Sequence, residues 1–135
     1  MRELVVYFNG VKVENNMDIE LKQVQTQPKI KFNIPANKYY TILMVDPDAP
    51  SATDPINKHW LHWMVMNNNE TVINFQPSLP PKNSGKHRYY IYLLEQQNKI
   101  DKLPTYSRPK FSVEQFITKY KLKPIASFMY KTDNI

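Results

Sequence analysis

The sequence predicts a mainly β protein in which two sheets pack together and one short helix is added. Three observations support this fold class. Runs of β-branched and aromatic residues recur along the chain, proline and asparagine turn signals separate them, and only one segment has helical periodicity. A chain of 135 residues with 41% hydrophobic content can build one core but not two, so we expect a single domain over residues 1–135.

The first predicted strands form a hairpin over residues 4–13. Valine and aromatic residues flank Asn9 and Gly10, which tolerate the positive φ angles of a type I′ turn. Residues 19–24 are a weaker strand candidate. Residues 30–34 alternate between apolar and polar side chains, which predicts a half-buried strand.

Three longer strands and one helix are predicted in the rest of the chain. Residues 39–45 are apolar on both faces, as is typical of a central strand, and residues 61–66 and 87–94 are further strands. Residues 112–120 fit a helix, because a serine begins the segment and a glutamine three residues later completes a capping box. A final strand is expected over residues 125–130.

Strand alternation assigns side chains to faces. It predicts that His62 shares a face with Met64 and Met66, and that His87 shares a face with Tyr89.

Composition excludes several classes of site and partner. Without cysteine, the chain has no disulfide and no thiolate chemistry, which fits a reducing compartment. The net charge of +6 comes from scattered lysines, so we expect no nucleic-acid partner. No apolar run reaches the roughly 20 residues of a membrane span and no targeting signal is visible, so we expect a cytoplasmic protein. Eleven prolines against two glycines indicate rigid loops.

Three polar residues fall at the ends of the predicted strands. Asp46 follows the strand over 39–45, while His62 and His87 lie at the beginnings of the next two long strands. If the first two strands pair in antiparallel fashion, Asp46 and His62 lie at one rim of the sheet, and the long connection before His87 returns the chain there. We therefore expect these three residues to converge, with Tyr89 beside them.

The predicted cluster supports several kinds of chemistry. Two imidazoles and a carboxylate match an open metal site or an acid/base hydrolase that uses Asp46, His62 and His87. They also match a phosphate pocket in which histidine N–H groups donate hydrogen bonds. A serine nucleophile at Ser51 with His62 as its base is a weaker alternative, because no nucleophile elbow surrounds that serine.

Two sequence segments resemble the signatures of the phosphatidylethanolamine-binding protein family, which includes Raf kinase inhibitor proteins and plant flowering regulators. Residues 46–51, which read D-P-D-A-P-S, together with W-L-H-W at 60–63, are similar to the first signature. P-P-K at 80–82 and G-K-H-R-Y at 85–89 are similar to the second. The likeness covers roughly residues 24–130.

The resemblance implies a β-sandwich-like fold with a small, rigid pocket that binds phosphate-bearing headgroups. The implied ligand-binding residues are Asp46, Pro47, Pro50, His62, Pro80, His87 and Tyr89. Among them, Pro47, Pro50 and Pro80 match prolines that are cis in the family. No catalytic residue, metal or cofactor is implied.

The resemblance also implies a non-enzymatic binding and regulatory protein that modulates a kinase or a protease through protein contacts. We expect a monomer that binds a phosphate-bearing small ligand or lipid headgroup, with peripheral membrane contact. Two departures from the family pattern matter. Leu79 replaces a glycine and would narrow or close the pocket, which leaves a scaffold with an occluded pocket as an alternative. Lys86 adds a cation near the site.

Overall fold

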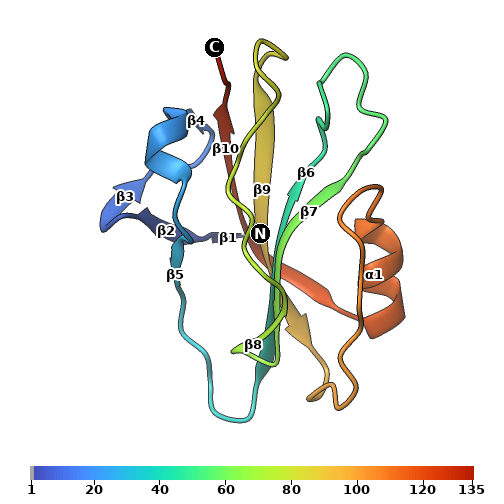
Figure 1. The fold of residues 1–135 in the computed structure, drawn as a ribbon. Helices are drawn as coiled ribbons and strands as arrows, with labels where there is room; N and C mark the ends of the chain where they lie inside the picture. The colour runs from blue at the N-terminus through green and yellow to red at the C-terminus, as the bar shows by residue number, and fades with distance from the viewer. Residues whose placement is uncertain (1) are drawn as a thin grey trace.

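Two sheets form the protein in a computed structural model that describes residues 2–135 (Figure 1). The central sheet has seven strands, in the order β1 (Arg2–Glu3), β10 (Lys123–Thr132), β9 (His87–Gln96), β6 (Tyr39–Asp46), β7 (Trp60–Met66) and β8 (Glu70–Ile73), with β4 (Met17–Asp18) also paired to β10. The small sheet has three strands, in the order β3 (Val11–Val13), β2 (Val5–Phe8) and β5 (Lys29–Lys31). A 3-10 helix, η1 (Leu21–Val24), and an α-helix, α1 (Val113–Tyr120), complete the fold.

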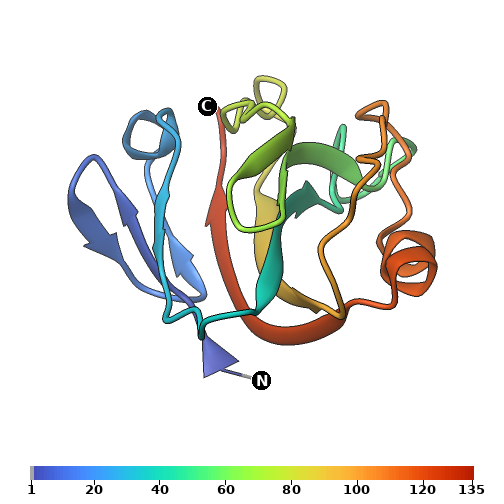
Figure 2. The same ribbon diagram turned by 90° about the horizontal axis from the view of Figure 1, so that it is seen from below.

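The small sheet and α1 lie on opposite faces of the central sheet (Figure 2). One buried cluster lies between the two sheets and contains Val6 and Phe8 of β2 with Ile91 of β9. A second cluster joins the central sheet to α1 through Leu43 and Phe116. This arrangement confirms the mainly β fold class with two packed sheets and one short helix.

The predicted hairpin is present at the N-terminal end of the described residues. Strands β2 and β3 pair in antiparallel fashion, and the turn residues Asn9 and Gly10 have φ angles of 52° and 77°. The helix also begins as predicted, because the Ser112 hydroxyl accepts a hydrogen bond from the Gln115 backbone amide at 3.1 Å. Local turn and cap chemistry therefore determines both elements.

Two predictions about secondary structure need correction. The strand candidate over residues 19–24 is wrong, because η1 forms there and the Gln25 side chain donates to the Leu21 carbonyl at its start. The strand predicted for 30–34 is β5, which ends at residue 31. The polar segment after β7 contains an unpredicted strand, β8, which pairs with β7.

Strands β6 and β7 are antiparallel neighbours, which was the pairing that the predicted cluster required. Their register contains a bulge. Met44 lies opposite Trp63, whereas the next residue, Val45, lies opposite Leu61, so His62 is an extra residue on β7. A bulge of this kind directs two consecutive side chains to the same side of the sheet.

The bulge changes the face on which His62 lies. Its ring contacts Tyr89, and both Tyr89 and Trp63 belong to the core between the two sheets. Met64 and Met66 belong to the core beneath α1. The prediction that His62 shares their face is therefore wrong, and the correction brings the imidazole to the side of the sheet where His87 and Asp46 lie.

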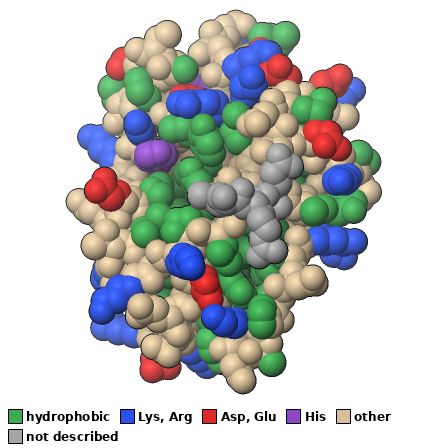
Figure 3. Space-filling model, turned by 180° about the vertical axis from the view of Figure 1, so that it is seen from behind, with side chains coloured by type: hydrophobic (Ala, Val, Ile, Leu, Met, Phe, Trp, Pro, Cys, Tyr) green, Lys and Arg blue, Asp and Glu red, His purple; other side chains and the backbone are tan. Residues whose placement is uncertain are grey.

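The exposed surface shows how the positive charge is distributed. On the face seen in Figure 3, lysine and arginine side chains are spread singly around a band of hydrophobic side chains, with acidic groups between them.

No helix among residues 2–135 combines the length and the apolar character that a membrane span requires.

Candidate functional site

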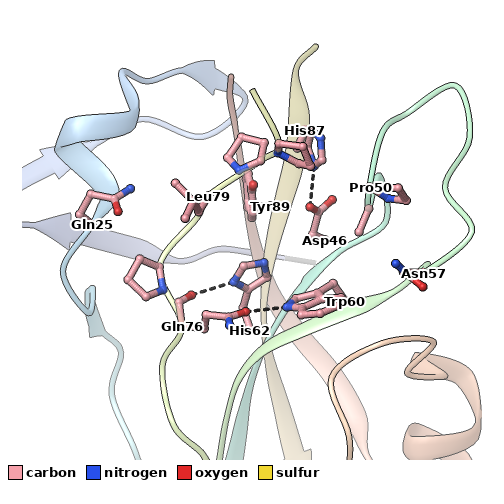
Figure 4. Close-up of a pocket in the computed structure, with 14 residues that line it drawn as sticks. Gln25, Asp46, Pro50, Asn57, Trp60, His62, Gln76, Leu79, His87 and Tyr89 are labelled. Carbon is pink, nitrogen blue, oxygen red and sulfur yellow. Dashed lines mark hydrogen bonds and ion pairs between the residues drawn. The ribbon is translucent and has the colours of Figure 1, made fainter. Parts of the chain in front are cut away.

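A cavity of about 350 Å³ opens at the rim where β6 ends and where β7 and β9 begin (Figure 4). The loop after β6, the segment 76–81 and the end of η1 form its walls. The residues that line it are Gln25, Asp46, Ala49, Pro50, Asn57, Trp60, His62, Gln76, Pro77, Leu79, Pro80, Pro81, His87 and Tyr89. The cavity is thus apolar and proline-rich, with a few polar groups at defined positions.

A buried hydrogen bond between His87 and Asp46 lies at one side of the cavity. His87 Nδ1 lies 2.8 Å from Asp46 Oδ2, and the two side chains are 1% and 4% exposed. The second carboxylate oxygen of Asp46 accepts a hydrogen bond of 2.7 Å from the Asp48 backbone amide. Because carboxylate oxygens accept, His87 Nδ1 carries the hydrogen, and Nε2 is directed to the Ser84 hydroxyl at 3.0 Å.

His62 is also held in a defined tautomer. Its Nδ1 lies 2.7 Å from the Gln76 carbonyl oxygen, which accepts only, so Nδ1 donates. Burial lowers the pKa of His62 below its usual 6.5 because the low-dielectric surroundings disfavour a charged ring. The ring is therefore neutral at pH 7, and its Nε2 is a hydrogen-bond acceptor (Figure 4).

Gln76 makes three hydrogen bonds that hold this side of the cavity, although the sequence did not indicate it as a site residue. Its carbonyl oxygen accepts from His62, its backbone amide donates to the His62 carbonyl, and its side-chain oxygen accepts from Trp60 Nε1 at 2.6 Å. On the opposite wall, the Gln25 amide donates to the Ser78 carbonyl at 2.8 Å and so ties η1 to the segment 76–81. Neither glutamine has a sequence signal that distinguishes it from a surface residue.

Tyr89 forms the floor between the two imidazoles. Its ring is stacked on His87 with centroids 6.3 Å apart and meets His62 edge-on at 5.3 Å. Burial and the nearby Asp46 carboxylate raise the pKa of Tyr89 well above its usual 10, so the phenol stays protonated.

An ion pair between Asp48 and Arg88 supports the loop after β6. The Asp48 carboxylate accepts from the Arg88 backbone amide at 2.8 Å, from Nε at 3.0 Å and from Nη2 at 2.9 Å. Burial alone raises the pKa of Asp48, but the hydrogen bonds from Arg88 outweigh it and hold that pKa below 3.8. Asp48 is therefore ionised and fixes the loop that carries the Asp46 contact.

The predicted site residues come together, with one exception. Asp46, Pro50, His62, Pro80, His87 and Tyr89 line the cavity. Pro47 is buried but does not line it, because the chain turns at this residue and Asp46, its neighbour, takes the position at the wall.

The prolines differ from the pattern that the resemblance implies. The Ala49–Pro50 peptide is cis, whereas the peptides that precede Pro47 and Pro80 are trans. The trans form is the more stable one for most peptide bonds to proline, so trans is the conformation expected in the absence of a local constraint.

Leu79 and Lys86, the two residues that differ from the family pattern, have little effect on the cavity. Leu79 lies at the rim with 69% of its surface exposed, and it does not fill the cavity. Lys86 makes an ion pair with Asp18 at 2.7 Å and is not among the lining residues. The interpretation as a scaffold with an occluded pocket is therefore not supported.

The structure also tests two enzymatic alternatives, a metal site and a serine nucleophile at Ser51. Within residues 2–135, no three histidine, aspartate or glutamate side chains are grouped in a way that would hold a metal ion. Ser51 pairs with Thr53 at 3.3 Å, whereas the Nδ1 of His62 is bound to a carbonyl, so the proposed pairing of this serine and this histidine is wrong.

Comparisons with known proteins identify the family and agree with the fold. A family model described as phosphatidylethanolamine-binding protein matches residues 9–72. The phosphatidylethanolamine-binding protein homolog R644 of Acanthamoeba polyphaga mimivirus is 44% identical to this chain, over 94% of each. The crystal structure of carboxypeptidase Y inhibitor complexed with its cognate proteinase has a similar fold, with a TM-score of 0.82, 22% identity, and coverage of 98% of this chain and 83% of that chain. Phosphatidylethanolamine-binding protein from Plasmodium vivax gives a TM-score of 0.76 and 20% identity, with coverage of 99% and 88%.

Proposed function

Because the chain belongs to the phosphatidylethanolamine-binding protein family, we propose that it is a non-enzymatic binding protein whose cavity accepts a phosphate-bearing headgroup. The relative and the similar structures are named as binding or inhibitor proteins, which fits this class. The observation that carries the proposal is the convergence of Asp46, His62, His87 and Tyr89 on one rigid cavity of about 350 Å³.

The free polar groups of the cavity indicate how such a ligand would bind. Within residues 2–135, the side-chain amides of Asn57 and Gln76 have N–H groups without an acceptor, so they are suited to phosphate oxygens. His62 Nε2 accepts, so it suits the ammonium group or a phosphate hydroxyl of the ligand. A headgroup that contains both kinds of group would satisfy all three side chains.

Phosphoethanolamine is the probe that tests this proposal. We expect NMR titration to shift the side-chain signals of His62 and Gln76, and His62→Phe to weaken binding about tenfold, since one hydrogen bond in a buried site contributes roughly 1.4 kcal/mol. Lys86→Ala, which changes a residue outside the cavity, should bind like the wild type. Unchanged signals at millimolar ligand would refute the proposal.

A protein partner is the second part of the proposed function. The carboxypeptidase Y inhibitor binds a proteinase in its crystal structure, so a protease is the partner class that has support from a similar structure. A kinase is the alternative that the family resemblance implies. The monomeric state, the peripheral membrane contact and the cytoplasmic location stay predictions.

A further inference from the structure

The proposed binding function does not use the Ser84 hydroxyl, which forms a hydrogen-bonded row with His87 and Asp46. The Ser84 hydroxyl oxygen lies 3.0 Å from His87 Nε2, and His87 Nδ1 lies 2.8 Å from Asp46 Oδ2. A serine at one imidazole nitrogen and a carboxylate at the other is the arrangement that activates a serine for nucleophilic attack. Such triads are recognised by geometry, because they occur in different folds and in different chain orders.

We propose that Ser84 is a reactive nucleophile that is acylated by activated esters, with His87 as its general base and Asp46 as the positioning group. Ser84 Oγ would form a bond to the ester carbonyl carbon while its proton moves to His87 Nε2. The bond between that carbon and the leaving oxygen then breaks, and the leaving oxygen takes the electron pair and the proton from Nε2. The products are an acylated Ser84 and one alcohol, so the imidazole returns to its starting state.

The positions of Asp46 and His87 suit these roles. The carboxylate accepts from Nδ1, so Nε2 is the ring nitrogen that faces the Ser84 hydroxyl and would take its proton. Asp46 is itself fixed by the Asp48 amide at 2.7 Å, and His87 is 1% exposed, so neither group has to move to reach Ser84.

Ser84 is half-buried, so its side chain is partly accessible to solvent. It precedes Gly85, which is exposed, and a Cβ placed on Gly85 would meet no heavy atom within 4 Å other than those of its chain neighbours. The backbone amides of Gly85 and Lys86 donate to no other group within the described part of the chain. In the proposed step the Gly85 amide would stabilise the oxyanion, a role that the amide after a nucleophile often takes.

A purely structural role for Ser84 would have the same hydrogen bond, since a buried imidazole needs a partner at each nitrogen. Reactivity distinguishes the two roles. An ordinary serine hydroxyl does not react with esters or fluorophosphonates at neutral pH, whereas a positioned general base accelerates the attack by about 10² to 10⁴.

The experiment exposes the folded full-length chain to a fluorophosphonate probe, which reacts at serine by the same displacement with fluoride as the leaving group. Intact mass spectrometry should show one adduct, and peptide mapping should place it on Ser84. Ser84→Ala should abolish the adduct and His87→Gln should slow its formation about 100-fold or more, while Ser51→Ala, a serine without an imidazole partner, should react like the wild type.

Circular dichroism checks that each variant is folded, and urea-unfolded wild type should form no adduct. Absence of an adduct on the folded wild type, or an adduct that persists in Ser84→Ala, would overturn the proposal. If His87→Gln does not fold, the wild type and Ser84→Ala decide the question alone.

Discussion

Arg88→Ala tests whether an ion pair outside the cavity supports the site within it. Arg88 binds Asp48 through Nε and Nη2, and Asp48 in turn donates its backbone amide to Asp46. The alanine variant keeps the backbone amide that bonds to Asp48 but removes both guanidinium contacts. A carboxylate that is 4% exposed would then lack two charged donors.

The expected loss follows from these contacts. Hydrogen bonds to charged groups contribute about 1.5 to 3 kcal/mol each, so two of them set an upper value of about 6 kcal/mol. The Arg88 side chain is 46% exposed, which means that solvent screens the pair and that water can replace part of the guanidinium. We therefore expect the free energy of unfolding to fall by about 2 to 3 kcal/mol, or the Tm by about 10 °C for a domain of this size.

Urea denaturation followed by circular dichroism measures this loss, and NMR measures the accompanying change at Asp48. With the guanidinium removed, burial is opposed mainly by the backbone hydrogen bond that the variant keeps, so the pKa of Asp48 should rise from its lowered position. Lys86→Ala is the matched control, because its ion pair with Asp18 is exposed and should contribute nothing measurable. Equal stability of the two variants would refute this account of the loop.

Three further outcomes are expected. Ser112→Ala should lower the free energy of unfolding by about 1 kcal/mol in urea denaturation, because α1 loses its N-cap; Ser112→Asp should not. Stability should fall as the pH drops below 6.5, by up to about 1.4 kcal/mol per pH unit for one imidazole, because burial lowers the pKa of His62 and the unfolded chain then binds a proton that the folded chain does not. Burial also lowers the pKa of His59, so His62→Phe should reduce this slope near pH 6, and an unchanged slope would contradict the effect assigned to His62. Affinity for phosphoethanolamine, followed by calorimetry, should rise from pH 7.5 to 5.5, because the phosphate, with a second pKa of about 6, then carries a hydrogen that His62 Nε2 accepts; a pH-independent affinity would show that Nε2 accepts from the ammonium group instead.

Strand alternation and turn chemistry predicted most of the framework. The hairpin at Asn9-Gly10 and the cap at Ser112 depend on neighbours in sequence, so local patterns were sufficient to locate them. The position of Asp46 at the end of a central strand followed from the apolar run before it. The antiparallel pairing of β6 and β7 then brought Asp46 and His62 to the same rim, as the prediction required.

Features that depend on contacts between distant segments could not be predicted in this way. The bulge at His62 arises from the register between two strands, and strict alternation placed that side chain on the wrong face. Gln76 and Gln25 acquire their roles only because η1 and the segment 76–81 meet across the cavity. Ser84 reaches His87 within a short loop, but the role of that contact requires Asp46, which is 41 residues away from His87.

The chemistry of the cavity depends on the hydrogen-bond partners of its two histidines. The sequence suggested imidazole N–H groups that donate to a phosphate. In the structure, the Nδ1 hydrogen of His62 is bound to the Gln76 carbonyl and that of His87 to Asp46, so neither Nδ1–H group is available to a phosphate. A phosphate would therefore obtain its donors from the side-chain amides of Asn57 and Gln76, whereas His62 Nε2 requires a hydrogen from the ligand, on its phosphate or on its ammonium group. The residue types locate the site, but their hydrogen-bond partners decide which protonation state of the ligand it prefers.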